Sequence, residues 1–173
     1  DLGLKVKWAN MNIGATTPEG YGDYFAWGET KPYYTEGHAK DNPCTNWRQG
    51  KEAGYAWSSY FDTKDGGSTF VTYGEGKATK LKPEHDAAQV NWKGKWRMPT
   101  KDELQELFVK CDWNVKTLNG IHGYEVTGPN GNSIFLPASG YRNDGTLVNV
   151  DDSGRYLSSS FSTFDENNGV YSI

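Results

Sequence analysis

The stretch WRMPTKDELQELF, at residues 96–108, constrains the fold of this chain more than any other segment. Thr100 is a favourable helix N-cap, and Glu103 follows at the spacing of a capping box, in which each residue satisfies the other's backbone N–H. Apolar side chains then recur at helical spacing, at Leu104, Leu107, Phe108 and Cys111. The sequence therefore predicts an amphipathic helix after Thr100, with one buried face.

The residues just before this helix could either hold the fold together or take part in chemistry. Arg97 carries a planar guanidinium suited to a carboxylate or to backbone carbonyls. Trp92 and Trp96 flank a turn at residues 93–95. No base or nucleophile stands beside Arg97 in the sequence, so a structural role for this junction is favoured over a chemical one.

Other periodic segments predict mostly short strands. Leu4, Val6 and Trp8 alternate with lysines, which is the pattern of a half-buried strand, and a short strand is expected over residues 24–27. A short helix is expected to start at Pro83 and to end near Trp92. Turn signals at 119–120, at 129–131 and past 140 predict a meander of antiparallel strands, followed by strands within 154–164 and from 170.

Length and composition favour one α+β domain. A single domain is expected over residues 1–173, and it could be part of a longer surface protein. The 21 Gly indicate short elements joined by many turns, and 7 Trp, 11 Tyr and 7 Phe are expected to supply most of the core. Residues 31–82 form an irregular insertion, which either binds a ligand or is packed by its own aromatic side chains.

Charge and hydropathy argue against two classes of partner. With 18 Lys and Arg against 22 Asp and Glu, the net charge is −4 and there is no basic run, so no nucleic-acid partner is expected. No apolar run approaches the roughly 18 residues of a membrane span, so no membrane insertion is expected. The start at Asp1, without a signal-like segment, indicates a mature or excised chain.

Metal and cysteine chemistry receive little support from the spacing of the residues. His38, His85 and His122 show no zinc-ligand spacing. The oxygen-rich stretches 151–152 and 165–168 could bind calcium or form ordinary turns, so no cofactor is expected, with calcium as the alternative. Cys44 and Cys111 either form one disulfide or remain separate thiols, with Cys111 on the buried helix face.

Four blocks of the sequence together resemble the FISUMP-type major paralogous domain of bacterial surface proteins. They are DLGLKVKWANMNIGATTPEGYGDYFAWGET, DAAQVNWKGKWRMPTKDELQEL, HGYEVTGPNGNSIFLPASGYR and RYLSSS. That family resembles the C-type lectin-like superfamily, near the formylglycine-generating, sulfatase-modifying branch, whose RLPTEAEWE-like block is similar to residues 97–104. The resemblance implies a C-type lectin-like fold: a twisted antiparallel sheet flanked by two helices, with long loops.

The chain also departs from these relatives. The copper-binding cysteine pair of the enzyme branch has no match, so the resemblance does not imply oxidase activity. Residues 128–130 are Gly-Pro-Asn, with glycine where calcium-dependent lectins carry a carboxylate. The family's final strand, similar to SVRPV, is missing, so either the chain is truncated or the last strand pairing is remodelled, which leaves a strand edge that a partner could occupy.

The resemblance implies a non-catalytic ligand-binding or adhesion module of an extracellular or bacterial cell-surface protein. Its partner would be a glycan or a protein. The alternatives are a structural or assembly domain of a larger surface protein and, as a minor one, a formylglycine-generating-type enzyme. The expected ligand-binding residues are Tyr141, Arg142, Asn143, Asp144, Tyr156, Phe161, Phe164, Asn167 and Asn168.

Overall fold

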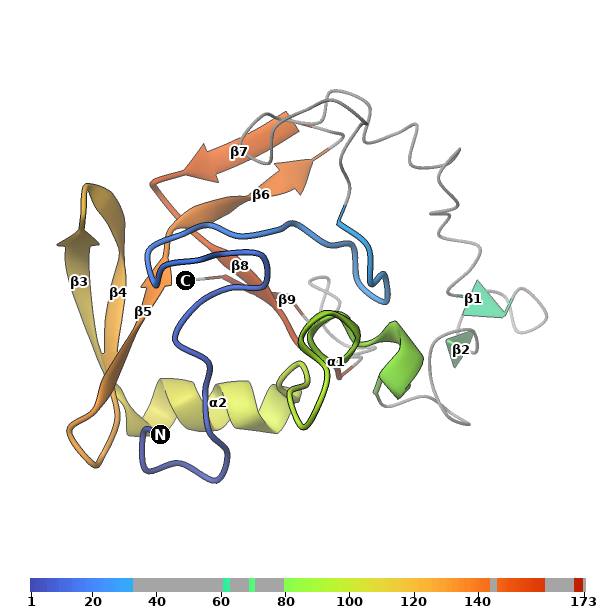
Figure 1. Ribbon diagram of the computed structural model, residues 1–173, viewed down its shortest axis with the longest axis horizontal. Coiled ribbons are helices and arrows are strands. Elements are labelled where there is room, and N and C mark those ends of the chain that lie inside the picture. Colours follow the sequence, from blue (N-terminus) through green and yellow to red (C-terminus); the bar gives the residue numbers. More distant parts are fainter. Residues whose placement is uncertain (33–60, 63–68, 71–79, 144–145, 161–169, 173) are drawn as a thin grey trace.

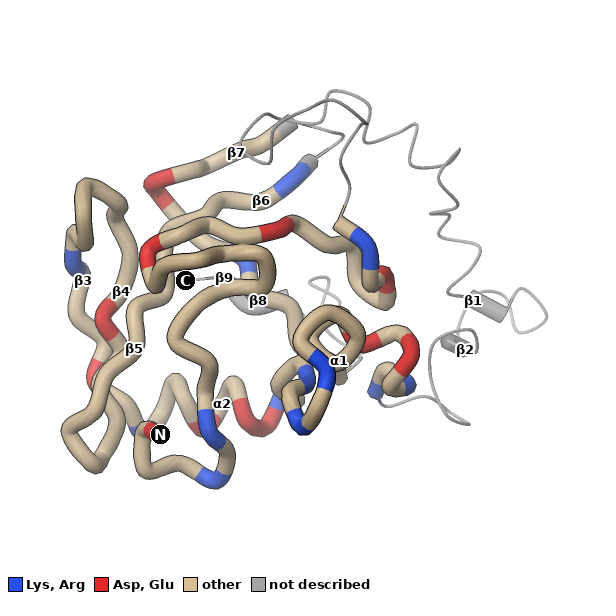
Figure 2. The backbone as a smooth tube through the Cα atoms, in the orientation of Figure 1, with Lys and Arg blue, Asp and Glu red and all other residues tan. Residues whose placement is uncertain are grey.

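The computed structural model describes residues 1–32, 61–62, 69–70, 80–143, 146–160 and 170–172 (Figure 1). In these ranges the chain is a mixed α+β protein with two short helices, α1 (Ala87–Trp92) and α2 (Lys101–Lys110), and small antiparallel sheets. The α+β prediction is confirmed at this level. No helix in the described ranges is long and apolar enough to cross a membrane. Basic and acidic residues are intermixed along the described backbone (Figure 2).

Helix α2 forms as the sequence predicts. The Glu103 backbone N–H donates to Thr100 Oγ1 at 3.3 Å, and the Thr100 N–H donates to Glu103 Oε2 at 2.8 Å, which completes the capping box. Leu104 and Leu107 are 4% and 1% exposed, so the predicted face is buried. The helix ends at Cys111, a buried C-cap residue whose thiol is free in the described part of the chain, while Cys44 lies outside it.

Helix α1 differs from its prediction at its start. Residues Pro83–His85 form a separate 3₁₀ turn, η4, and α1 begins only at Ala87 because Asp86 is its N-cap. One Asp86 carboxylate oxygen accepts from Gln89 N–H at 2.9 Å, and the carboxylate also accepts from Met98 N–H. This buried side chain therefore both caps α1 and holds the chain that leads to α2.

The predicted meander is confirmed. Strands β3 (Asp112–Leu118), β4 (Ile121–Thr127) and β5 (Ser133–Pro137) form an antiparallel sheet in the order β3-β4-β5. Strand β6 (Ser139–Asn143) pairs with β7 (Thr146–Val150), and β8 (Arg155–Leu157) pairs with β9 (Val170–Ser172). Within the predicted insertion, β1 (Phe61–Asp62) pairs with β2 (Thr69–Phe70).

Two predicted strands near the N-terminus are wrong. Residues 4–8 and 24–27 contain no strand. Burial nevertheless alternates over 4–8, where Lys5 and Lys7 are exposed and the apolar residues are partly buried. Alternating burial requires only that an extended segment packs one side against the core. It does not require hydrogen bonds to a neighbouring strand, and this segment has the packing without pairing to any described strand. The strand expected within 154–164 is present as β8, and residues 161–169 lie outside the described ranges.

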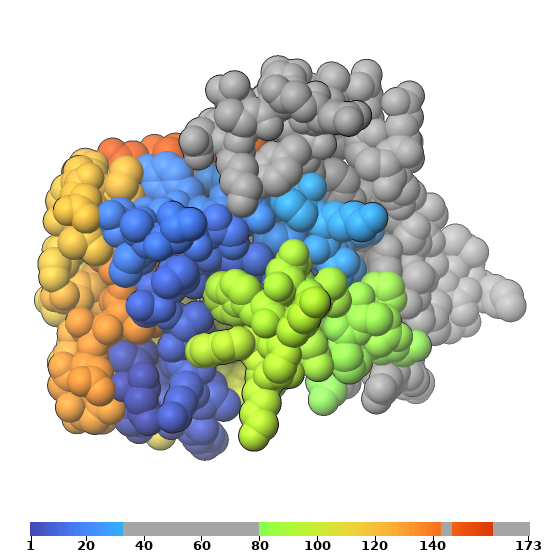
Figure 3. Space-filling model, in the orientation of Figure 1, coloured from blue at the N-terminus to red at the C-terminus, as the bar shows by residue number. Residues whose placement is uncertain are grey.

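The described residues form two core clusters, and the first joins the N-terminal segment, α2 and the three-stranded sheet. The first contains Leu2, Leu107 and Val126, with Cys111 and Ile134. The other contains Leu81, Ala87, Ala88 and Met98, against which Phe25 and Trp27 pack. Gly128 is required beside the first cluster, because a Cβ there would collide with the Leu2 carbonyl oxygen. The N-terminal segment thus contributes Leu2 to the core, while other residues of the segment lie across the front face of the molecule (Figure 3).

Candidate functional site

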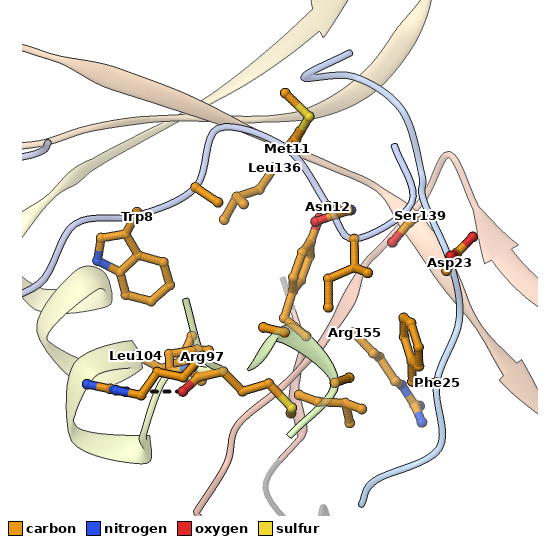
Figure 4. Close-up of a pocket in the computed structure, with 18 of the residues that line it drawn as sticks. Trp8, Met11, Asn12, Asp23, Phe25, Arg97, Leu104, Leu136, Ser139 and Arg155 are labelled. Atoms are coloured by element: carbon orange, nitrogen blue, oxygen red, sulfur yellow. Dashed lines mark hydrogen bonds between the residues drawn. The ribbon is translucent and has the colours of Figure 1, made fainter. Parts of the chain in front are cut away.

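A cavity of about 660 Å³ lies between the N-terminal segment, the two helices and strands β6 and β8. Its walls come from residues 6–29, 87–113 and 136–157. Figure 4 shows Trp8 and Leu104 on one side and Phe25 and Arg155 on the other. We call this space the central cavity. Its volume falls in the range of about 300–1,000 Å³ that is usual for small-molecule sites.

The loop that forms one wall is held by short-range contacts that need small residues. Asn12 Nδ2 donates to the Tyr21 carbonyl oxygen at 3.1 Å, and the Asp23 N–H donates to the Ile13 carbonyl oxygen at 2.7 Å. Gly22 has a φ of 72°, and a Cβ on it would collide with Ile13 O. The glycine-rich sequence therefore brings the two arms of this loop together beside the cavity.

Two tyrosine hydroxyls tie this wall to the strands. Tyr24 Oη donates to the Ser139 carbonyl oxygen at 2.6 Å, and Tyr156 Oη donates to the Pro137 carbonyl oxygen at 2.9 Å. Asn12 Nδ2 also donates to Tyr156 Oη at 3.5 Å. Burial raises the pKa of Tyr156 to about 12. The Tyr156 phenol is therefore a neutral group at physiological pH, and its hydroxyl stabilises the cavity wall.

Two arginines stack on tyrosine rings at the β6 and β8 side of the cavity. Arg155 Cζ lies 3.4 Å from the centroid of the Tyr141 ring, and Arg142 Cζ lies 5.1 Å from that of Tyr24. Both distances permit cation–π attraction. Arg155 is exposed, and in the described part of the chain its guanidinium has no hydrogen-bonded or ionic partner. Its N–H groups are therefore available to a ligand.

Arg97, on the opposite side of the cavity, has a structural partner. Its Nη1 and Nη2 donate to Glu103 Oε2 and Oε1 at 2.8 and 2.6 Å, which is a bidentate ion pair. The Arg97 guanidinium, together with the Thr100 N–H, lowers the pKa of Glu103 to about 2. Both groups of this pair stabilise the start of α2, in agreement with the structural role favoured by the sequence.

The described residues contain no group of three or more His, Cys, Asp and Glu side chains that could hold a metal ion. Of the two stretches considered for calcium, 165–168 lies outside the described ranges. In the other, Asp151 accepts from the His122 N–H at 2.9 Å and lies 3.0 Å from His122 Nδ1. The Asp151 carboxylate therefore already has a protein partner.

The structure brings three of the predicted ligand-binding residues to one place. Tyr141, Arg142 and Tyr156 all line the central cavity. Asn143 ends β6, but its side chain is outside what the structure describes. The other predicted residues, Asp144, Phe161, Phe164, Asn167 and Asn168, lie outside the described ranges. Their assignment to the site stays a prediction.

Sequence reasoning missed several residues of the same cavity. Arg155 directly precedes the predicted Tyr156, and the motif GRYL gives no sign of which neighbouring ring its guanidinium covers. Trp8 and Asn12 come from a segment some 130 residues before β6, so only the tertiary fold places them here. The one available signal was the density of aromatic and glycine residues in 10–27.

Comparisons of the chain with protein-family models, with curated proteins and with solved structures found no match.

Proposed function

We propose that this chain is a non-catalytic ligand-binding or adhesion module that recognises a glycan or a protein ligand at the central cavity. The observation that carries the proposal is the exposed Arg155 guanidinium, stacked on Tyr141 beside an aromatic-walled cavity of about 660 Å³. Aromatic faces contact sugar rings or anchor apolar side chains, and arginine supplies directional donors. The site thus offers both kinds of contact that either ligand class needs.

The chemistry of the cavity wall supports binding rather than catalysis. The two wall residues with the largest pKa changes are Glu103, at about 2, and Tyr156, at about 12. Each makes hydrogen bonds that hold the fold, Glu103 to Arg97 and Tyr156 to the Pro137 carbonyl. A general acid or base works best with a pKa near the pH at which it acts. The pKa values of Glu103 and Tyr156 both lie far from 7.

We further propose that the elements form a C-type lectin-like fold in an extracellular or bacterial cell-surface protein. Two helices beside small antiparallel sheets, with an N-terminal segment packed against α2 and β4, support this assignment. The observed capping box at residues 100–103 also fits the block through which the chain resembles the FISUMP-type family. Ligand binding through Arg155 and Tyr141 would not require calcium.

A glycan array and a pulldown from cell-surface extracts, each run in calcium and in chelator, would test the proposal. Saturable capture of a ligand in both buffers is expected. Replacing Arg155 by Ala should weaken capture about ten- to a hundredfold, since hydrogen bonds to charged groups contribute about 1.5–3 kcal/mol. Lys110→Ala is the matched control, because it removes the same charge from an exposed side chain on α2. Equal affinities of the two variants would refute the assignment of the site.

A further inference from the structure

Strand β3 forms an open edge of the three-stranded sheet. Among the described residues it pairs only with β4, and Figure 1 shows it as the outermost strand of that part of the molecule. Five of its seven residues are exposed, with Val115 at 77%. A seven-residue edge with an exposed valine at its centre is the type of strand that pairs with another chain unless it is protected.

The hairpin register shows which backbone groups of β3 face outward. Leu118 pairs with Ile121 across the two-residue turn Asn119–Gly120, whose φ angles are 50° and 86°. The two residues that flank such a turn form a hydrogen-bonded pair, and hydrogen-bonded and non-hydrogen-bonded pairs then alternate along the two strands. The N–H and C=O groups of Trp113, Val115 and Thr117 therefore point away from β4. In the described ranges they have no other hydrogen-bond partner.

We propose that two copies of this chain associate through β3, paired antiparallel about a two-fold axis at Val115. Val115 would then lie opposite Val115 of the second copy, and Trp113 opposite its Thr117. By symmetry, Thr117 would lie opposite Trp113 of the second copy. Each of the three pairs exchanges two backbone hydrogen bonds, about six in all, so every outward group finds a partner. The two three-stranded sheets would join into one continuous sheet.

The charges of β3 fit this register. Asp112 and Lys116 are its two charged residues, and antiparallel pairing places Lys116 of one copy diagonal to Asp112 of the other. The two Lys116 side chains also approach each other, but each already forms an ion pair with Glu125 of its own β4. The exposed Val115 side chains would be covered by each other. This self-pairing does not depend on the proposed ligand-binding function.

Cysteine cross-linking of the whole chain tests both the association and its register. Val115→Cys should give a disulfide-linked dimer under mild oxidation, because hydrogen-bonded antiparallel partners lie about 5.5 Å apart between Cα atoms, within disulfide range. Thr117→Cys is the matched control: its two copies would be offset by four residues, or about 13 Å. The wild-type chain, which carries Cys44 and Cys111, gives the background. Equal cross-linking of both variants, or none with Val115→Cys, would overturn the proposal.

Sedimentation equilibrium of the uncross-linked protein supplies a second test. The wild-type chain should show a concentration-dependent dimer, and Val115→Pro should be monomeric, since proline removes only an outward N–H and spares the β3–β4 ladder. Far-UV circular dichroism verifies that the variant is folded, and Val115→Lys replaces it if it is not. A wild-type monomer at all concentrations, or binding of a strand peptide without self-association, would refute self-pairing.

Discussion

Replacing Glu103 by Gln would measure how much the ion pair at the start of α2 stabilises the protein. Glu103 accepts two hydrogen bonds from Arg97 and one from the Thr100 N–H. Glutamine is also a good third residue of a capping box, so this substitution keeps the cap and removes the charge. The variant therefore isolates the electrostatic contribution of Glu103 from its capping contribution.

The pKa of Glu103 gives an upper limit to that contribution. It falls from 4.5 to about 2. At about 1.36 kcal/mol per pKa unit, this difference corresponds to about 3 kcal/mol. The Glu103 side chain is only 14% exposed, but that of Arg97 is 44% exposed, so solvent screens the pair. We therefore expect Glu103→Gln to lower the free energy of unfolding by about 1–2 kcal/mol at pH 7.

The sign of the pH dependence follows from the direction of the pKa change. A carboxylate whose pKa is lower in the folded state stabilises the protein above its unfolded pKa, and this stabilisation is lost as the pH falls through the folded value. The difference between the wild type and Glu103→Gln should thus be full above about pH 5 and mostly lost near pH 2. Urea unfolding followed by tryptophan fluorescence at several pH values measures it.

A matched control variant tests whether the loss of stability comes from the Arg97–Glu103 ion pair. Glu84→Gln removes the same charge from an exposed residue of η4 and should change stability by less than about 0.5 kcal/mol. If Glu103→Gln were no more destabilising than this control, or if its effect were the same at pH 7 and near pH 2, the electrostatic argument would be refuted.

Two further predictions concern packing. Leu107→Ala should lower the free energy of unfolding by about 2–5 kcal/mol, because Leu107 is 1% exposed, whereas Val109→Ala on the same helix, where Val109 is 71% exposed, should change it by less than about 0.5 kcal/mol. Similar losses in urea unfolding would contradict the assigned face of α2. Gly128→Ala should cost more than about 1 kcal/mol, since the added Cβ collides with the Leu2 carbonyl and must displace the N-terminal segment. Unchanged stability would show that Leu2 does not pack there.

The elements that the sequence predicted well are those determined by nearby residues. The capping box at Thr100 and Glu103 and the turn at Asn119–Gly120 each fix a local geometry through a few adjacent side chains. The antiparallel meander follows, because short turns leave successive strands no other neighbour. For α1 the local signal was ambiguous, since both Pro83 and Asp86 are good first residues, and the buried Asp86 begins the α-helix.

The elements that the sequence did not predict depend on distant partners. Residues 4–8 alternate as a strand would, yet they form no ladder with any described part of the chain. The central cavity likewise requires Trp8, Arg97 and Arg155, from three separate segments, to line the same space. Tyr141 and Arg142 could be proposed as site residues from the resemblance, but the contact of Arg155 with Tyr141 is a property of the folded chain alone.

The walls of the central cavity come from three separate segments of the chain, so ligand binding there would be coupled to folding. Residues 6–29, 87–113 and 136–157 enclose this space only when the chain is folded, so an occupant binds the folded state and not the unfolded one. At a ligand concentration of 100 times Kd, mass action adds about 2.7 kcal/mol to the stability. For a chain of this size, that raises the melting temperature by roughly 5–11 °C. Thermal unfolding therefore reports occupancy without a label, and it ranks glycans and peptides on a single scale.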